Sequence, residues 1–433
     1  MMRVITRSCL ALMLGFAVAP ASRAAQQSPD QLPLYKMVRA LQTVQDSVIS
    51  GNLDDIDMQR FLLDEIDKRL LSADPSVFDD TRNVDAALIY AMSGGNPQTI
   101  DVLADRDVAG NFDNRITSML RRYLNGRGGT ILTQLKEIVP EYRNTEIGPY
   151  LELIGANALM EKDEMTALKY FNWARLEAPG TIVEEAALRR ALNLTSKKGD
   201  TAKALPYVRR YARRFMSSPY ASQFADIFVG LALDHPEALP PAEISEVLSL
   251  VERRRQREIY LRLARRAAIF GQKVLADFAS QEARRLSEPG EASQLALAKL
   301  YSNLVNIPTS GVEDVLGQLG AIPDKDLSPK DRFLRDAAQI VAEEESLTQV
   351  KRDKVDKEYR DRMSELVLDA GKTSSTTTNA MAPASQNGQQ DGKAETHKQA
   401  LDDQIGKAEN FVGLGRSKLN DIDALLSSES IPQ

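Results

Sequence analysis

Few residues in this 433-residue sequence have the types and spacing that enzyme chemistry requires. It contains two histidines, His235 beside a proline and His397 next to a polar run. A Ser-His-Asp triad or a multi-histidine metal site therefore has almost no candidates. Residues 371–373, Gly-Lys-Thr, match the end of a phosphate-binding loop, but Leu366 stands where that motif needs a glycine. The pattern argues against histidine-based and nucleotide-dependent catalysis.

Paired carboxylates are a second route to catalysis, because a glycosidase needs only two of them. Acidic clusters occur at Asp54-Asp55, Glu184-Glu185 and residues 343–345. On helices such clusters usually face solvent or lie near positive N-termini. Trp173, the single tryptophan, is expected to pack inside a helix pair and not to stack on sugar. We predict no catalytic, cofactor-binding or metal-binding residue and no enzyme activity; a glycan-cleaving enzyme is the weaker alternative.

Arginines form a more informative pattern, because they cluster on expected helices. Four of them recur at i, i+1, i+4 and i+5, which places them on one helix face. Guanidinium groups pair bidentately with carboxylates, so such a face suits an acidic protein surface. The alternative is a solvated face whose charges are balanced by neighbouring repeats. The predicted protein-binding face comprises Arg209, Arg210, Arg213, Arg214, Arg253, Arg254 and Arg257, with Arg255, Arg262, Arg265 and Arg266 in related clusters.

Charge is distributed unevenly along the chain. The formal net charge is −6, yet residues 184–290 hold 19 Lys and Arg against 13 Asp and Glu. This basic stretch predicts an acidic partner. The N-terminal sequence predicts that the protein is exported, and export disfavours nucleic acid as that partner.

The N-terminus has the pattern of a secretory signal. Arg3 and Arg7 precede an apolar run over residues 9–18, and small residues follow up to Ala24, the predicted cleavage site. The run of about ten residues is half of the ~20 that span a bilayer, so we expect no membrane insertion. Cys9, the single cysteine, would leave with the signal. The prediction is a periplasmic protein whose fold rests on its core alone.

One segment matches a tetratricopeptide-like helix-turn-helix repeat. Within residues 148–180, Gly155 lies in the first helix, Asp163 at the turn, Ala167 and Phe171 in the second helix, and Pro179 at its end. Weaker copies surround it, and positions equivalent to Ala167 recur at intervals of 33, 34 and 37 residues, at Ile100, Thr133, Ala167 and Ala204. This predicts an all-α repeat solenoid, with a plain helical bundle as the alternative.

The expected organisation follows from these repeats and from composition. We predict a signal peptide at 1–24, an N-terminal helical-repeat domain at 25–235 and a second one at 236–345. A charged helix at 346–370, a disordered linker at 371–397 and an amphipathic helix at 398–427 follow. The last helix carries a stripe of mostly apolar residues at 4-3 spacing, formed by Leu401, Ile405, Ala408, Val412, Gly415, Leu419, Ile422 and Leu426. Packing against the rest of the chain or against a partner helix would cover it.

Two stretches resemble the MotC family of periplasmic motility proteins. They are LPLYKMVRAL at residues 32–41 and YFNWARLEAPG at 170–180, which runs into VEEAALRR at 183–190. The chain length, the predicted signal peptide and the low-complexity run before a predicted final helix also resemble that family. The resemblance implies a non-enzymatic factor for flagellar rotation that associates with the periplasmic part of the stator protein MotB and governs the coupling of ion flux to rotation. It transfers no binding residues, and the oligomeric state stays open. A general periplasmic scaffold or chaperone is the alternative.

Overall fold

The computed structural model describes residues 32–373 except residue 289 and residues 308–310, and the backbone alone for residues 365–373. Every regular element in this part is a helix. The predicted signal peptide, the linker beyond Thr373 and the helix at 398–427 lie outside the described residues. The all-α prediction is confirmed.

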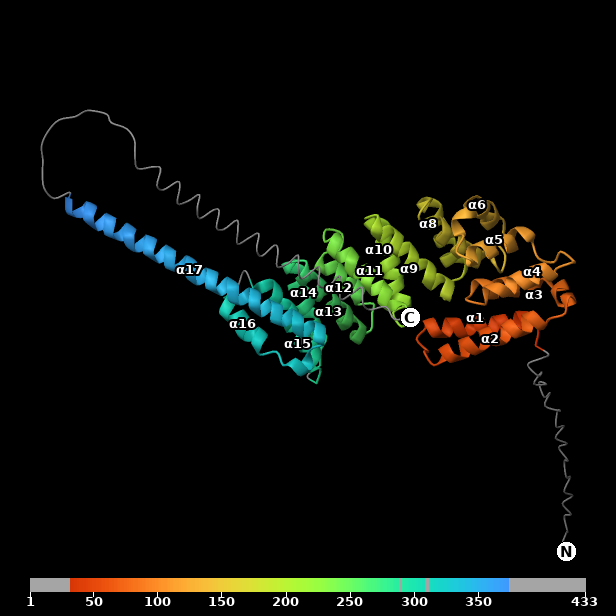
Figure 1. Cartoon of the computed structure of the whole chain (residues 1–433), viewed down its shortest axis with the longest axis horizontal. Coiled ribbons are helices and arrows are strands. Elements are labelled where there is room, and N and C mark those ends of the chain that lie inside the picture. The colour runs from red at the N-terminus through yellow and green to blue at the C-terminus, as the bar shows by residue number, and fades with distance from the viewer. Residues whose placement is uncertain (1–31, 289, 308–310, 374–433) are drawn as a thin grey trace, which may run out of the picture.

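Sixteen helices form eight successive helix-turn-helix units, and a long helix follows them (Figure 1). The first helices are α1 (Leu34–Ile49), α3 (Thr81–Met92), α5 (Asn114–Leu124), α7 (Gly148–Leu159), α9 (Ile182–Lys197), α11 (Ala221–Asp234), α13 (Arg253–Ile269) and α15 (Ala292–Asn306). The second helices are α2 (Asp55–Ser72), α4 (Pro97–Arg106), α6 (Leu132–Glu141), α8 (Glu164–Glu177), α10 (Thr201–Arg214), α12 (Pro241–Leu248), α14 (Lys273–Leu286) and α16 (Val312–Gly320). The long helix is α17 (Pro329–Thr373), and short 3-10 helices lie at Pro75–Asp79, Gly128–Thr130 and Asp324–Asp326.

The units from α3 to α9 recur at a regular interval. The helices α3, α5, α7 and α9 begin at residues 81, 114, 148 and 182, which gives spacings of 33, 34 and 34 residues. Polar contacts between successive units recur at the same separation: Arg143 to Glu177, Arg189 to Gln223 and Arg209 to Glu243 each join residues 34 apart. Each unit therefore packs on the next by similar contacts, as in a solenoid.

The α7–α8 unit shows why the repeat residues matter. Asp163 accepts a hydrogen bond from the Thr166 amide at 3.1 Å and caps α8. Phe171 is fully buried between the helices. A Cβ on Gly155 would lie 3.0 Å from Val139 and 3.1 Å from Tyr170, so this glycine permits close helix approach. The roles predicted for these positions are confirmed.

The first units curl back onto the middle of the chain. In α1, the Asp46 carboxylate accepts a hydrogen bond of 2.9 Å from the Ile182 amide at the start of α9. Gln42 donates to the Tyr150 hydroxyl of α7 at 2.8 Å. Gly51, at φ +111°, lies so close to Ser217 that a Cβ there would stand 2.9 Å from the serine Cβ. These contacts bring the N-terminal helix against helices more than a hundred residues away.

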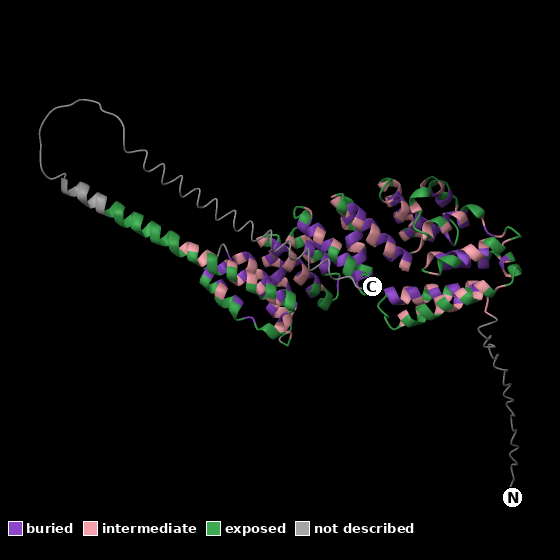
Figure 2. Cartoon of the chain, viewed as in Figure 1, coloured by how far each residue is buried: buried purple, intermediate pink, exposed green. Residues whose placement is uncertain are grey.

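The hydrophobic core is one cluster that extends from Leu34 to Ala342. The predicted domain boundary at residue 236 falls in the connection between α11 and α12, and the core continues past it; the two-domain division stays a prediction. The boundary predicted after residue 345 lies inside α17, because no glycine or proline interrupts the helical sequence there. Residues 351–364 of α17 project away from the body and are exposed (Figure 2).

Close packing at Gly155 predicts a test of the repeat architecture. Gly155→Leu should destabilise the fold by about 1–3 kcal/mol, because the new side chain meets Val139 and Tyr170. Gly317→Leu is the matched control, since that glycine lies in α16 with nothing within 4 Å of a Cβ. Urea unfolding followed by circular dichroism measures both. Equal stability of the two variants would show that the α7–α8 packing is not tight.

Candidate protein-binding groove

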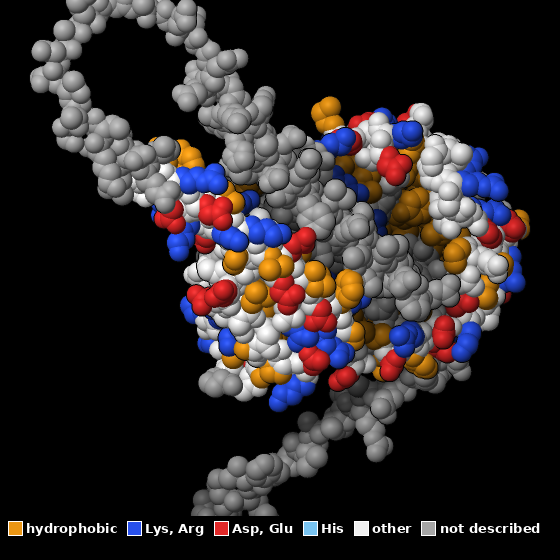
Figure 3. Space-filling view, turned by 60° about the vertical axis from the view of Figure 1, so that its left-hand side comes forward, with side chains coloured by type: hydrophobic (Ala, Val, Ile, Leu, Met, Phe, Trp, Pro, Cys, Tyr) orange, Lys and Arg blue, Asp and Glu red, His pale blue; other side chains and the backbone are white. Residues whose placement is uncertain are grey.

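The first helices of the units line an inner groove of about 480 Å³. Its wall combines apolar, aromatic and charged side chains from α3, α7, α9 and the start of α11, among them Met92, Tyr150, Leu153, Arg189, Arg190 and Gln223. Figure 3 shows that the molecule is hollowed, with hydrophobic side chains on the inner wall. A concave surface built by repeated helices is a common place for solenoids to hold a partner.

Two adjacent carboxylates on α9 fix the side chains around this groove. Glu185 is fully buried and pairs with Arg189, with Nε–Oε1 2.9 Å and Nη2–Oε2 3.2 Å. The Tyr211 hydroxyl donates to the same carboxylate at 2.7 Å. Burial raises the pKa of Tyr211, with the Glu185 charge adding to the effect, so the tyrosine stays a donor. The Tyr211 bond joins α10 to α9, and the Glu185 carboxylate already neutralises Arg189.

Arg190 differs from its neighbour because no carboxylate of the described residues pairs with it. Its Nη1 donates to the Asn157 side-chain oxygen at 2.6 Å. Its Nε is buried and makes no hydrogen bond within the described part of the chain. Burial lowers the pKa of this guanidinium, but arginine stays charged in proteins. The groove therefore contains a half-buried cation whose charge no carboxylate of the described residues neutralises, and a carboxylate of a partner could bind it.

The arginines predicted on α10 are mostly engaged within the fold. Arg210 and Arg214 converge on the fully buried Glu184, at 2.8 and 3.4 Å. Arg209 pairs with Glu243 of α12 at 2.7 Å. Arg213 is exposed and forms no ion pair with any described residue. Three of these four arginines thus join neighbouring helices, as the alternative of internally balanced charge expects.

The arginines predicted on α13 lie at its beginning and have other partners. Arg253 donates to the Leu286 carbonyl oxygen at 3.2 Å, and Arg254 pairs with Glu258 at 3.4 Å. Arg257 is almost buried and pairs with Glu291. No contact described in the structure joins them to the arginines of α10. That the arginines of α10 and α13 act together as one binding face stays a prediction.

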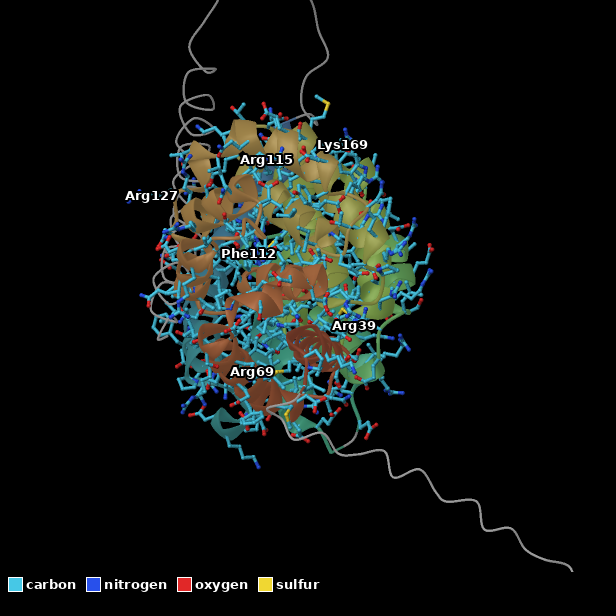
Figure 4. All side chains as sticks on the ribbon, turned by 90° about the vertical axis from the view of Figure 1, so that its right-hand side faces the viewer. Arg39, Arg69, Phe112, Arg115, Arg127 and Lys169 are labelled. Carbon is cyan, nitrogen blue, oxygen red and sulfur yellow. The ribbon has the colours of Figure 1, made fainter. Side chains whose placement is uncertain are left out.

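Other basic residues of the molecule are also dispersed or paired. Arg262 pairs with Asp226 at 2.7 Å, beside a second groove of about 590 Å³ that Arg266 also lines. At the N-terminal end, Arg39, Arg69, Arg115 and Lys169 lie apart from one another (Figure 4) and come from four different helices. Within the described residues no group of His, Cys, Asp and Glu is placed to hold a metal ion, and no helix there is long and apolar enough to cross a membrane.

Sequence reasoning missed Arg190 as a candidate. It expected Glu184-Glu185 to face solvent or to lie near a positive helix N-terminus; the pair lies in the first turn of α9, and both side chains are buried. The signal that could have found the site is the spacing of Glu185 and Arg189 at i and i+4, which pairs them on α9. Arg190, in contrast, has no carboxylate four residues before or after it.

Comparison with known proteins agrees with the resemblance noted in the sequence. The family model described as chemotaxis protein MotC matches residues 1–431. The chemotaxis protein MotC of Rhizobium meliloti (strain 1021) is 45% identical over 433 residues, which cover 98% of each chain. This chain belongs to the MotC family. No solved structure matches it.

A buried acid beside the groove gives this MotC-family protein a pH-dependent stability. Glu152 of α7 is fully buried, and neither carboxyl oxygen has a hydrogen-bond partner among the described residues. Its closest cation is Arg143 at 4.0 Å, which bonds Glu177 at 2.6 Å and lies 4.2 Å from the Trp173 ring centroid. Burial, with repulsion from Glu177, raises the pKa of Glu152 to about 8.

This raised pKa predicts that the fold loses stability between about pH 4.5 and 8. In the unfolded chain, Glu152 loses its proton near its ordinary pKa of 4.5. In the folded state the buried carboxylate is disfavoured, so the stability of the fold falls as pH rises through that interval. Relative to the unchanged protein, Glu152→Gln should therefore be more stable at pH 8 than at pH 4.5 by about 4 kcal/mol. Urea unfolding at both pH values measures this.

The control for this prediction is Glu161→Gln, which removes an exposed carboxyl group. It should change stability equally at both pH values. The buried-acid explanation is wrong if Glu152→Gln shows the same pH dependence as Glu161→Gln.

Proposed function

We propose that this protein is a non-enzymatic periplasmic factor for flagellar rotation that holds a partner protein in its inner groove. The MotC family match supports a motility-related role. The groove supports partner binding, because it joins apolar wall residues to polar groups that fix orientation. The predicted secretory signal supports the periplasm as the place of action.

The observation that carries the proposal is the unpaired guanidinium of Arg190. A cation that is partly removed from water loses hydration, and a carboxylate ligand restores the lost interactions through charge-assisted hydrogen bonds. Leu153 and Tyr150 provide apolar surface next to it. An acidic side chain of a partner segment, flanked by apolar residues, fits this combination.

The partner that we propose is the periplasmic part of the stator protein MotB, in line with the family resemblance. Binding can shift an equilibrium between stator states only by favouring one of them. The factor would therefore control coupling of ion flux to rotation by binding one conformation of the stator more tightly than the other.

A direct binding measurement tests this proposal. The chain from residue 25 to 433 is titrated with the MotB periplasmic domain from the same organism, by calorimetry. We expect specific binding that Arg190→Met weakens at least tenfold, because hydrogen bonds to charged groups contribute about 1.5–3 kcal/mol. Arg213→Met is the matched control, since Arg213 is an exposed arginine without a described ion pair, and it should bind like the unchanged protein.

Other outcomes separate the remaining interpretations. Loss of binding in Arg213→Glu with Arg254→Glu, but not in Arg190→Met, would move the interface to the predicted arginine face. These two positions are chosen because reversal at Arg210 or Arg214 would strip partners from the buried Glu184. Binding to many unfolded chains and not to MotB would contradict the motor role and favour the scaffold or chaperone.

A further inference from the structure

The long helix α17 has two apolar faces, and the described residues cover only one. Leu334, Ala338 and Ala342 are buried in the core. Of the seventeen exposed large hydrophobic residues in the described chain, seven belong to this single helix. They are Phe333, Ile340, Leu347, Val350, Val355, Tyr359 and Met363.

The first three of these exposed residues have the spacing of a helix-packing seam. Phe333, Ile340 and Leu347 follow one another at seven-residue intervals, the spacing of a coiled-coil seam. Ile340 is two residues from both Ala338 and Ala342, so at about 100° per residue it points roughly 160° away from the buried side. The seam therefore faces away from the body of the solenoid.

The projecting half of α17 also lacks packing that would stabilise it. Residues 351–364 are all exposed (Figure 2). Helices gain most of their stability in proteins from burying an apolar face, and short isolated helices are marginal in water. Val355, Tyr359 and Met363, at four-residue intervals, provide such a face on this half. At about 100° per residue they lie roughly 80° to 160° from Leu347, so this face turns toward the side of the buried Ala338 and is separate from the seam. An additional helix is expected to cover this face.

The sequence after α17 contains a segment of matching length and pattern. The 4-3 stripe from Leu401 to Leu426 covers 26 positions, about 38 Å of helix at 1.5 Å per residue. The part of α17 from Leu347 to Thr373 has nearly the same length. Residues 374–397 lie between the two segments, enough chain to reverse direction and return.

The composition of the segment indicates that it needs a partner. It contains Gly406, Gly413 and Gly415, and each glycine in a helix costs about 1 kcal/mol relative to alanine. A helix with this content is unstable alone, while small residues allow a neighbouring helix to approach closely. Tethering gives the segment an effective concentration near the millimolar range at α17, which favours it over a second copy of the chain.

We propose that residues 398–427 pack antiparallel on the Val355, Tyr359 and Met363 face of α17 and form a helical hairpin with it. Leu401 then lies beside the end of α17, and Leu419 lies opposite Val355. The hairpin makes α17 a rigid arm that extends from the solenoid.

Hydrogen exchange measures the proposed contact directly. Full-length protein from residue 25 is compared with a chain that ends at residue 397, and amide exchange is followed over residues 340–363 by mass spectrometry. We expect exchange in this region to become at least tenfold faster without the segment, because its cover is removed. Exchange over α7 to α9 serves as the internal control and should be the same in both chains.

Cysteine cross-linking identifies the occupant. Residues 25–433 contain no cysteine, so Val355→Cys and Leu419→Cys are the only two cysteines of the double variant. We expect an oxidised monomer, and a control pair of Val355→Cys with Asp402→Cys should stay reduced. Unchanged exchange on removing the segment would overturn the proposal, and a disulfide-linked dimer would overturn it by showing a second copy as the occupant.

Discussion

Two neighbouring carboxylates on α9, Glu184 and Glu185, hold the middle of the solenoid together. Both are fully removed from solvent, and a buried charge is tolerated only with several partners. Glu184 receives Arg210, Arg214 and the Gly180 amide at 2.6 Å, while Glu185 receives an arginine and a tyrosine. Both networks join α9 to α10, and the Gly180 amide joins Glu184 to the preceding loop. The groove wall is positioned by this arrangement.

The N-terminus of α9 also helps to form the groove. The Asp46 carboxylate of α1 binds the first amide of α9, where unpaired amides and the helix dipole favour negative charge. Burial raises the pKa of Asp46 against the opposing effect of this bond. The contact curls the first units toward α9, and the inner surface becomes a groove. Arg190, on the same helix, lies in that groove without a carboxylate among the described residues, whereas the buried Glu184 and Glu185 both have arginine partners.

The helix type and the repeat interval could be predicted from the sequence, because small residues such as Gly155 and Ala167 must recur where helices approach closely. The partners of the arginines could not. Arg210 and Arg214 share one helix face, as their spacing predicts, but only the fold shows that Glu184 lies beneath them. The curl of α1 onto α9 joins residues 136 apart, and no local pattern encodes that distance.

The central claim is that the inner groove, and not the outer arginines, binds the partner. Hydrogen-exchange mapping of the complex with the MotB periplasmic domain tests it most directly. The account predicts slower exchange along the groove-lining parts of α7, α9 and α11 when the partner is bound. Protection confined to the exposed ends of α10 and α13, with exchange in the groove unchanged, would contradict it.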